Sequence, residues 1–526
     1  MRSLLLVAAL TAGLSCSTPA QHPHGPGAPG ASPPAGAGEL HLFITTDEHG
    51  WLAPLVDVAA QEERGGVVRL FDRLTRVEGY AASPKGRARG LVLLSTGDMW
   101  TGPYESTLVE GEPMVAAMNH MGYAAAAVGN HDFDFGVRKL AEHHASARFP
   151  FLAANLVEAA TGEPPPWARP FTIVEVGSVK LGVVGMTNVD TPVTSDPRHL
   201  TGLSFLPYIE TLERWIPRAR AAGAEEIVVL VHDELLRADE LMPTLRKHRV
   251  RAASFGHHHQ AGARIDDGGT AELDDDVSIC NGGAYLRSYC RIDLRFAGGA
   301  LTARAVAVTQ VSGAHDEALP NRDAALVDIV ARAEEHAQRI GGEVLVEAAR
   351  PLRRGTQGEL GQLVVDAWLA ALPWAQVAIT NAGGIRQDLP AGPVRVRDIA
   401  SVLPFNNFLV VVELTGAELK EALTNPESVV AGVRYRFKDV GERRVVTALT
   451  WNDGRPVADA ERVRVVINDF MYRGGDHFSF ARWDEEPEET AVDWREPVLR
   501  RLRALGQQGQ ALALTPDDRA RPESAL

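Results

Sequence analysis

The sequence predicts an α/β protein with two substantial domains. The chain has 526 residues, and because a domain usually has roughly 100–200 residues, this length indicates more than one domain. In two separate regions, short apolar runs rich in β-branched residues alternate with stretches whose apolar residues recur at helical spacing. Hydrophobic residues make up 45% and charged residues 23%, as in ordinary globular proteins, which excludes wholesale disorder and a membrane protein with many spans.

The first 38 residues indicate an export signal followed by a linker. Residues 1–16 have the order of a short signal peptide: Arg2, an apolar run too short to span a bilayer, and small residues before Cys16. A lipoprotein signal that leaves a lipid anchor on Cys16 and a plain signal peptide both fit. In residues 17–38, Pro, Gly and Ala occupy 16 of 22 positions, which predicts a flexible tether. We therefore expect an exported protein, periplasmic or on the cell surface.

The rest of the chain divides into two α/β regions joined by a helix. Leu326, Ile329 and Ala333 recur at helical spacing and predict the connecting helix. No later segment is long and apolar enough to span a membrane. The predicted parts are a domain at 39–312, a linking helix at 313–342, a smaller domain at 343–515 and a tail at 516–526.

Charge and cysteine content narrow the partners and the compartment. The net charge of −15 gives no broad attraction to nucleic-acid polymers or anionic lipid, so any phosphate recognition must be local. Three cysteines are too few for a disulfide scaffold. An exported protein can pair Cys280 with Cys290, and the sequence leaves open whether it does.

Side chains that can bind metals follow five strand-like runs of the first region, where each run ends. In an open α/β sheet, loops beyond the carboxyl ends of the strands converge on one crevice. Each cluster alone is usually a cap or a turn, but five in one region favour a metal site. The clusters are Asp47-Glu48-His49, Gly97-Asp98, Asn130-His131-Asp132-Phe133-Asp134, His232-Asp233-Glu234 and His257-His258-His259.

The chemistry of these side chains is selective. Carboxylates, one carboxamide and imidazoles, without a thiol, suit Zn²⁺, Mn²⁺, Co²⁺ or iron, and their number is too high for one tetrahedral ion. Two divalent ions that share a carboxylate fit better. Such a pair lowers the pKa of a bridging water and polarises a phosphoryl oxygen, which is the usual arrangement for in-line hydrolysis of phosphate esters.

These motifs resemble the 5′-nucleotidase/UDP-sugar hydrolase family, within the calcineurin-like metallophosphatases. Asp47-Glu48-His49-Gly50 matches the family pattern D-x-H-G, Gly97-Asp98 matches its G-D, and Gly129 to Asp134 match its G-N-H-[ED]-F-D. The resemblance implies an N-terminal four-layer metallophosphatase β-sandwich flanked by helices, a linking helix, and a smaller C-terminal α/β substrate-binding domain. It also implies that the second domain rotates about a hinge within Asp316–Gly342.

The resemblance also implies the roles of the first-domain residues. One ion would be held by Asp47, His49, Asp98 and His259, and the second by Asp98, Asn130, His232 and His257. His131 would be the catalytic imidazole, oriented by Asp134. Two positions depart from the family: Thr46 stands where Asn usually precedes the first Asp, and Glu234 stands where Gly is common. The spacing leaves His258 as a bystander.

In the second domain, Asn381-Ala382-Gly383-Gly384-Ile385-Arg386 follows a short strand, where backbone N–H groups and a guanidinium can meet a phosphate or a sugar. The resemblance implies that Phe405 and Phe470 sandwich the nucleobase. Arg386 and Arg354 would hold the phosphate and ribose side, with Arg350 or Arg353 as alternatives to Arg354. The implied substrate-binding residues are Arg354, Asn381, Gly384, Arg386, Phe405, Phe470 and Asp476.

The sequence thus predicts an exported phosphohydrolase that removes the 5′-phosphate from small-molecule nucleotides by attack of a metal-bound hydroxide. Two divalent ions are expected, Zn or Mn first, with Co, Mg and Fe as further options. A UDP-sugar or other nucleotide pyrophosphohydrolase and a 2′,3′-cyclic-nucleotide phosphodiesterase are alternatives on the same site. A catalytically idle surface protein that binds nucleotide or metal is a third class. The sequence does not indicate the oligomeric state.

Overall fold

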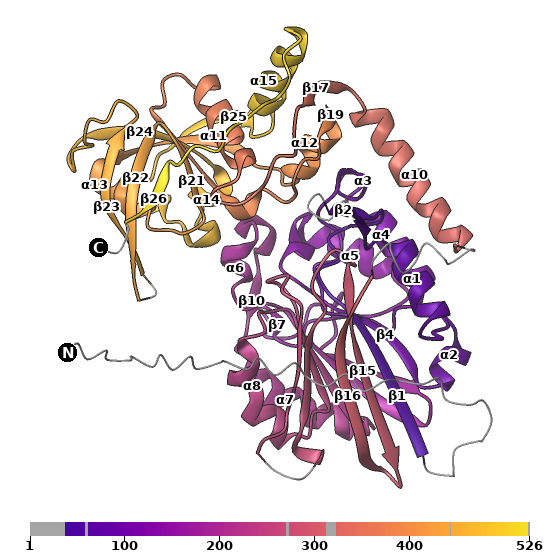
Figure 1. Ribbon diagram of the computed structural model, residues 1–526. Coiled ribbons are helices and arrows are strands. Elements are labelled where there is room, and N and C mark those ends of the chain that lie inside the picture. Colours follow the sequence, from indigo (N-terminus) through magenta and orange to yellow (C-terminus); the bar gives the residue numbers. More distant parts are fainter. Residues whose placement is uncertain (1–36, 58–61, 270–272, 312–321, 442, 524–526) are drawn as a thin grey trace, which may run out of the picture. The chain divides into compact units, whose positions relative to one another are not determined.

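The computed structural model describes residues 37–57, 62–269, 273–311, 322–441 and 443–523 (Figure 1). The predicted signal peptide, Cys16 and the predicted linker as far as residue 36 lie outside these ranges. Among the described residues, none of the helices is both long and apolar enough to cross a membrane.

Two six-stranded sheets form the centre of the first region. The first sheet has the order β16 (Ala300–Gln310), β15 (Ser288–Ala297), β1 (Ala37–Thr45), β4 (Leu91–Ser95), β5 (Ala125–Ala127) and β6 (Phe151–Leu152). The second has the order β13 (Gly262–Asp266), β14 (Val277–Asn281), β12 (Ala252–Phe255), β11 (Glu226–Val231), β9 (Val179–Met186) and β8 (Phe171–Val176). Strands β1, β4, β5 and β6 run parallel, as do β9, β11, β12 and β14. Their carboxyl ends therefore lie at a common edge of each sheet.

The two sheets pack face to face through apolar side chains that alternate along each strand. On β4, Val92 and Leu94 join the core between the sheets, whereas Leu91 and Leu93 point into the core under the helices. Both faces of this strand are buried, which explains its unbroken apolar run.

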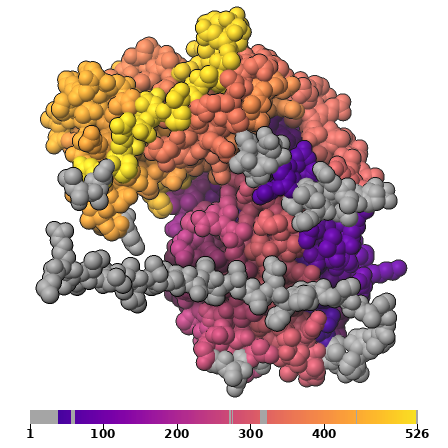
Figure 2. Space-filling view, viewed as in Figure 1, coloured from indigo at the N-terminus to yellow at the C-terminus, as the bar shows by residue number. Residues whose placement is uncertain are grey.

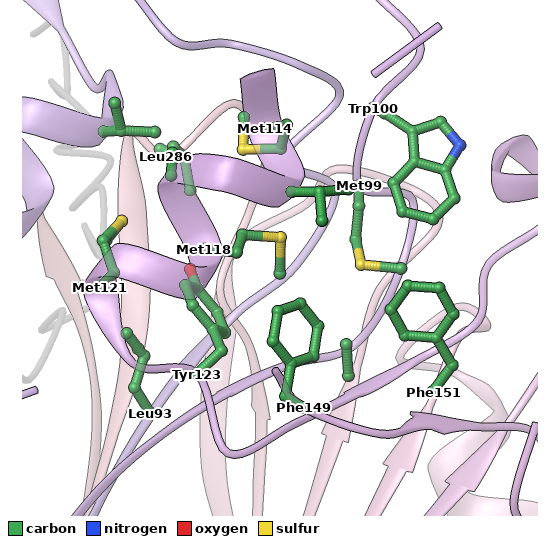
Figure 3. Packing of buried hydrophobic residues seen from close by; sticks show 14 of the residues in the cluster. Leu93, Met99, Trp100, Met114, Met118, Met121, Tyr123, Phe149, Phe151 and Leu286 are labelled. Atoms are coloured by element: carbon green, nitrogen blue, oxygen red, sulfur yellow. The ribbon is translucent and has the colours of Figure 1, made fainter. Parts of the chain in front are cut away.

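Helices cover the outer face of each sheet. The first sheet is covered by α1 (Val67–Arg76), α4 (Glu112–Met121) and α5 (Gly136–Ser146), and the second by α7 (Tyr208–Ala221) and α8 (Arg237–Lys247). Figure 3 shows the first of these outer cores, where Met114 and Met118 of α4 pack beside Met99 and Phe149. The flexible thioether side chains fill the irregular space between helix and sheet. Helix, sheet, sheet and helix confirm the predicted four-layer sandwich of mixed sheets.

The predicted linking helix is α10 (Ala324–Gly341). The carboxylate of Asp323 caps it by accepting hydrogen bonds from the backbone N–H groups of Ala325 and Leu326, each at 3.0 Å. Leu326 and Ala333 of α10 belong to the core that contains α4. Residues 312–321, which include the first part of the predicted linking segment, lie outside the described ranges.

The second region is built on a five-stranded sheet with cores on both faces. Its order is β21 (Ser428–Ala431), β18 (Val377–Asn381), β24 (Arg462–Asn468), β20 (Phe408–Thr415) and β25 (Glu488–Asp493). A second sheet has β23 (Arg443–Trp451), β22 (Val433–Val440) and β26 (Ala520–Pro522), and β17 (Val344–Ala348) pairs with β19 (Gly392–Arg395). The helices are α11 (Glu359–Ala371), α12 (Val396–Val402), α13 (Gly416–Ala422), α14 (Asp469–Tyr472) and α15 (Glu496–Gln507). Helix α15, yellow in Figure 2, lies at the surface and buries Val498 and Leu502 on its inner side.

A disulfide bond joins Cys280 at the end of β14 to Cys290 on β15. The two strands belong to different sheets of the sandwich, and both cysteines are fully buried. The pairing that the sequence left open is therefore present. It crosses the core between the two sheets, close to the loop of residues 282–287.

Candidate metal centre and substrate cavity

Two groups of metal-binding side chains lie at the carboxyl ends of the parallel strands. The first group is Asp47, His49 and His259, and the second is Asp98, His232 and His257; within each group, one ligand atom of every residue lies within 4.8 Å of the others. These residues follow β1, β4, β11 and β12, so the strand ends bring together side chains that are up to 212 positions apart. The sequence had predicted all six.

The backbone of this centre is strained. Asp47, His49, Asp98, His257 and His259 all have φ between +46° and +68°, the left-handed region that L residues other than glycine rarely adopt. Each such residue costs about 1–2 kcal/mol, and the conformation persists only where the surrounding structure holds it. Five of the six residues in the two groups therefore hold their side chains in place at a cost in backbone stability.

Asp98 lies between the two groups. Its Oδ2 atom is 3.0 Å from Nε2 of His232 and 3.6 Å from Nε2 of His49. Oδ2 of Asp98 and Nε2 of His232 are buried and have no hydrogen-bond partner, although they are close to each other. Buried polar atoms are almost always satisfied, so two orphans that face one spot fit a bound cation. The donor set thus fits the dimetal cofactor, and Oδ2 of Asp98 lies near a ligand atom of each group.

The backbone fixes two of the imidazole rings. The Nδ1 atom of His49 lies 2.8 Å from the carbonyl oxygen of Thr101, and that of His232 lies 2.9 Å from the carbonyl oxygen of Thr96. Since a carbonyl can only accept, Nδ1 of each ring donates its proton to the backbone, and Nε2 of each ring faces the carboxylate of Asp98. This is the usual way in which proteins orient a histidine ligand.

Burial and neighbouring charges set the protonation of the cluster. Burial alone would raise the pKa of the Asp98 carboxyl, but the positive charges of His232 and His131 outweigh it and hold that pKa well below its ordinary value. Burial likewise opposes the charged form of His232, but the charge of Asp98 raises its pKa to about 10. Burial lowers the pKa of His257 to about 3, helped by the charge of His232. The carboxylates therefore create a site that requires positive charge.

His131 and Asp134 stand beside this centre. The Nδ1 atom of His131 lies 3.0 Å from Oδ2 of Asp134, and its ring centroid lies 5.3 Å from that of His49. The backbone N–H of His131 donates to Oδ1 of Asp98 at 2.7 Å. A side chain on Gly129 would come within 2.1 Å of the same Oδ1 atom, so this approach requires glycine.

Asn130 is tied into the same loop. Its Oδ1 lies 3.0 Å from Nδ1 of His257, and its Nδ2 donates to the carbonyl of Thr194 at 3.2 Å. Asp132 has a different role, because its carboxylate accepts hydrogen bonds from the backbone N–H groups of Asp98, Met99 and Gly129. It joins the loop after β4 to the loop after β5.

The two departures from the family pattern have definite partners. The Thr46 hydroxyl donates to Oδ2 of Asp47 at 2.6 Å, so it supports a candidate ligand directly. Oε2 of Glu234 lies 3.1 Å from Nδ1 of His258. The added carboxylate is thus paired with the bystander histidine rather than with the candidate ligands.

A cavity of about 1000 Å³ opens beside the metal centre. Among the residues that line it are Asn130, His131, Asp134, His257, His259, Asn381, Arg386, Phe405, Phe470 and Asp476. A guanidinium nitrogen of Arg386 lies 3.2 Å from Nε2 of His49. The rings of Phe405 and His131 are stacked, with centroids 5.3 Å apart. Five of the seven predicted substrate residues therefore share one space with the candidate catalytic pair.

The other two predicted substrate residues, Arg354 and Gly384, are not among the residues that line the cavity. The Arg354 guanidinium donates to the carbonyl oxygen of Arg386 at 3.1 Å, so it contacts the backbone of a cavity residue instead. Asn381 lines the cavity, but its Nδ2 donates to Asp476 at 2.6 Å and its Oδ1 accepts from Asn468 at 2.9 Å. The side chain of Asn381 is thus engaged in holding Asp476.

Sequence reasoning missed two residues near these sites. Tyr285 lies in the loop of residues 282–287, and its hydroxyl is 3.2 Å from Nδ1 of His259. Glu427 lines the cavity, and burial together with the charge of Asp476 raises its pKa. Neither residue belongs to a cluster or a motif, so only the packing of the loops brings them to the sites.

Comparisons with known proteins match two separate parts of the chain. Residues 40–261 match the family model for calcineurin-like phosphoesterases, and residues 329–482 match the model for the 5′-nucleotidase C-terminal domain. Human 5′-nucleotidase is 26% identical over an alignment of 516 positions, gaps included, that covers 86% of this chain and 86% of that protein. A cell wall protein of Listeria monocytogenes is 26% identical over an alignment of 554 positions, gaps included, that covers 90% of this chain and 67% of that protein.

Among solved structures, a 5′-nucleotidase precursor of Thermus thermophilus has the same fold, with a TM-score of 0.78 and 24% identity over 93% of this chain and 100% of that one. The first matched model covers most of the first region, and the second covers most of the second region, each of which has its own core. The chain therefore belongs to the 5′-nucleotidase family, in which a calcineurin-like phosphoesterase domain precedes a 5′-nucleotidase C-terminal domain, and it is a metal-dependent phosphoric ester hydrolase.

Proposed function

We propose that this hydrolase removes the 5′-phosphate from nucleotides. The observation that supports this most directly is the approach of Arg386 and Phe405 to the metal centre, at His49 and His131 respectively. A guanidinium for the phosphate and an aromatic face for the base thus border the same cavity as the candidate catalytic pair. We further propose that metal binding belongs to residues 39–312 and nucleotide recognition to residues 343–515.

Each residue has a separate task in this proposal. Asp47, His49, Asp98 and His259 hold one divalent ion, and Asp98, Asn130, His232 and His257 hold the second. When bound, the ions supply positive charge to the phosphoryl oxygens and acidify a water molecule. His131, oriented by Asp134, stabilises the charge that develops on the transferred phosphoryl group. We favour zinc or manganese, because carboxylate and imidazole ligands suit both.

The second domain recognises the rest of the nucleotide. Arg386 contacts the phosphate, and Arg354 holds the backbone carbonyl of Arg386. Phe405 and Phe470 stack on the two faces of the base, which tolerates many bases because every base has a π-face. Asp476, held by Asn381, accepts hydrogen bonds from the ribose hydroxyl groups.

We also propose that the protein is exported. Disulfide bonds persist in oxidising compartments, and the Cys280–Cys290 bond supports such a location. A lipid anchor on Cys16 would keep the protein at the membrane surface. Analysis of the mature protein by mass spectrometry tests both points, because a lipidated Cys16 would be its first residue.

A second candidate is hydrolysis of the pyrophosphate bond of a UDP-sugar or a related nucleotide derivative. The cavity volume of about 1000 Å³ favours this candidate, because it lies at the upper end of the range for small-molecule sites. A 2′,3′-cyclic-nucleotide phosphodiesterase would use the same metal centre.

Chromatographic analysis of the products formed from AMP, UDP-glucose and 2′,3′-cyclic AMP tests these proposals. The purified full chain should release phosphate from AMP, lose this activity with EDTA and regain it with Mn²⁺ or Zn²⁺. Faster turnover of UDP-glucose or of the cyclic nucleotide would replace the first proposal with the corresponding alternative. Nucleotide binding without turnover of any of them, with metal present, would indicate an idle binding protein.

A further inference from the structure

Tyr285 has no assigned role, and its hydroxyl lies 3.2 Å from Nδ1 of the candidate ligand His259. His49 and His232 make the equivalent contact with backbone carbonyls, which nothing short of a backbone change can remove. In His259 the contact is made by a side chain. The contact at Nδ1 of this ring is therefore made by a hydroxyl group that a single substitution can delete.

The Tyr285 side chain is well placed to orient a ligand. It is 5% exposed, and its ring centroid lies 5.1 Å from that of His259, 5.8 Å from that of His49 and 5.3 Å from that of Trp51. Its backbone N–H donates to the carbonyl oxygen of Asp47 at 2.8 Å. Tyr285 thus touches all three residues of one metal-binding group, His49 and His259 through its ring and Asp47 through its backbone.

The loop that carries Tyr285 is held in a conformation that it would not adopt alone. Tyr285 and Leu286 both have left-handed backbone angles, with φ of +63° and +56°. Leu286 is anchored in the apolar cluster of Figure 3, where it is 1% exposed. Local strain of this kind persists where the surroundings fix it and gathers at functional sites.

Further contacts fix both ends of this loop. The Cys280–Cys290 bond lies just outside it, and the Ser288 hydroxyl donates to the carbonyl of Gly282 at 2.6 Å. Nδ2 of Asn281 donates to the carbonyl of Gly256 at 3.2 Å, immediately before the loop that contains His259. The two loops are therefore joined at a second point besides Tyr285.

We infer that Tyr285 is a positioning residue for the metal ion held by Asp47, His49 and His259. Its hydroxyl oxygen accepts the Nδ1 proton of His259, which leaves the lone pair of Nε2 directed at the ion; this Nε2 atom lies 3.1 Å from that of His49 and 3.5 Å from Oδ1 of Asp47. Removal of such an outer hydrogen bond lowers metal affinity about 10–100-fold in known sites. The inference rests on the dimetal centre of the proposed function.

The test is metal binding by the full chain after removal of its metal with a chelator. Free Mn²⁺ is measured by electron paramagnetic resonance during titration of the wild type, of Tyr285→Phe and of Tyr80→Phe. Tyr80 is a matched control, because it is also 5% exposed and its hydroxyl donates to the backbone carbonyls of Met121 and Gly122, both at 3.0 Å. The wild type and Tyr80→Phe should bind two ions alike. Tyr285→Phe should bind one ion normally and the other about 10–100-fold more weakly.

Kinetics add a readout that a packing defect would not reproduce. With AMP as substrate, Tyr285→Phe should need about 10–100-fold more Mn²⁺ for half-activation, and saturating Mn²⁺ should restore its kcat and KM. Wild-type affinity of Tyr285→Phe for both ions would overturn the inference, as would equal losses in Tyr80→Phe. A wild type that binds Mn²⁺ but does not hydrolyse AMP would refute the proposed function and leave this inference to the binding data.

Discussion

Oδ2 of Asp134 lies 3.0 Å from Nδ1 of His131, and both side chains line the cavity beside the metal centre. A carboxylate in this position fixes the orientation of the ring. Both residues lie in the part of the chain that matches the calcineurin-like phosphoesterases.

His131→Ala should lower kcat about 10²–10⁴-fold with AMP and leave the bound metal unchanged, because a positioned acid–base group contributes about this much and His131 is not a predicted ligand. Asp134→Asn should cause a smaller loss in kcat. Steady-state kinetics and metal analysis check both. His258→Ala, which removes a histidine paired with Glu234, is the control and should change kcat by about twofold or less. Wild-type turnover in His131→Ala would refute its role.

Arg386→Ala should raise KM for AMP about 10–100-fold, because a hydrogen bond to a charged group contributes about 1.5–3 kcal/mol. Arg386→Lys should restore only part of this, since an ammonium lacks the planar fork of donors. Arg354→Ala should have a smaller effect, because the Arg354 guanidinium donates to the backbone carbonyl of Arg386 and does not line the cavity. Equal losses in Arg354→Ala and Arg386→Ala would instead place both side chains on the substrate.

Phe405→Leu should weaken nucleotide binding selectively. Stacking on an aromatic side chain contributes about 1–3 kcal/mol per base, so KM for AMP should rise about 5–150-fold. Ribose 5-phosphate, which has no base, is the matched substrate, and its KM should not change. Phe470→Leu should behave in the same way. A parallel rise in KM for both substrates would show that the ring supports the cavity wall rather than the base.

The half-buried side chain of Glu105 on α3 (Tyr104–Thr107) makes stability depend on pH. Burial raises its pKa from 4.5 to about 7, and Glu334 and Asp398 add to this shift while its own backbone N–H and Arg397 oppose it. A raised carboxyl pKa stabilises the fold below the unfolded pKa, and this contribution disappears as the pH rises through about 7. Glu105→Gln should therefore remove part of the fall in melting temperature between pH 5 and pH 8. An unchanged pH profile in Glu105→Gln would contradict this prediction.

Cys280→Ala with Cys290→Ala should lower the free energy of unfolding by about 2–4 kcal/mol, because the bond restricts the unfolded chain. Equilibrium urea unfolding with EDTA present measures this without the contribution of bound metal. The single variants should lose a similar amount, since either one breaks the bond. A double variant as stable as the wild type would show that packing between the sheets alone holds these strands together.

The sequence predicted those residues of the metal centre that directly follow a strand. Each cluster follows a strand, and parallel strands end at one edge, so the pattern of residues alone is enough to place Asp47, Asp98 and His232 together. Contacts between residues of separate loops could not be predicted, because no sequence pattern shows how loops pack. The contact of Tyr285 with His259 and the position of Arg354 behind Arg386 both depend on how loops fold over one another.

The left-handed backbone of the metal centre limits how its ligands can be exchanged. At His49, His257 and His259 the chain accepts Asp and Asn more readily than other replacements, because these side chains tolerate positive φ best after glycine. A redesign of this centre for a harder cation, such as Mg²⁺, could therefore replace these histidines with Asp, whose carboxylate is the ligand that such a cation prefers. A softer site built from cysteine would first have to rebuild the loops.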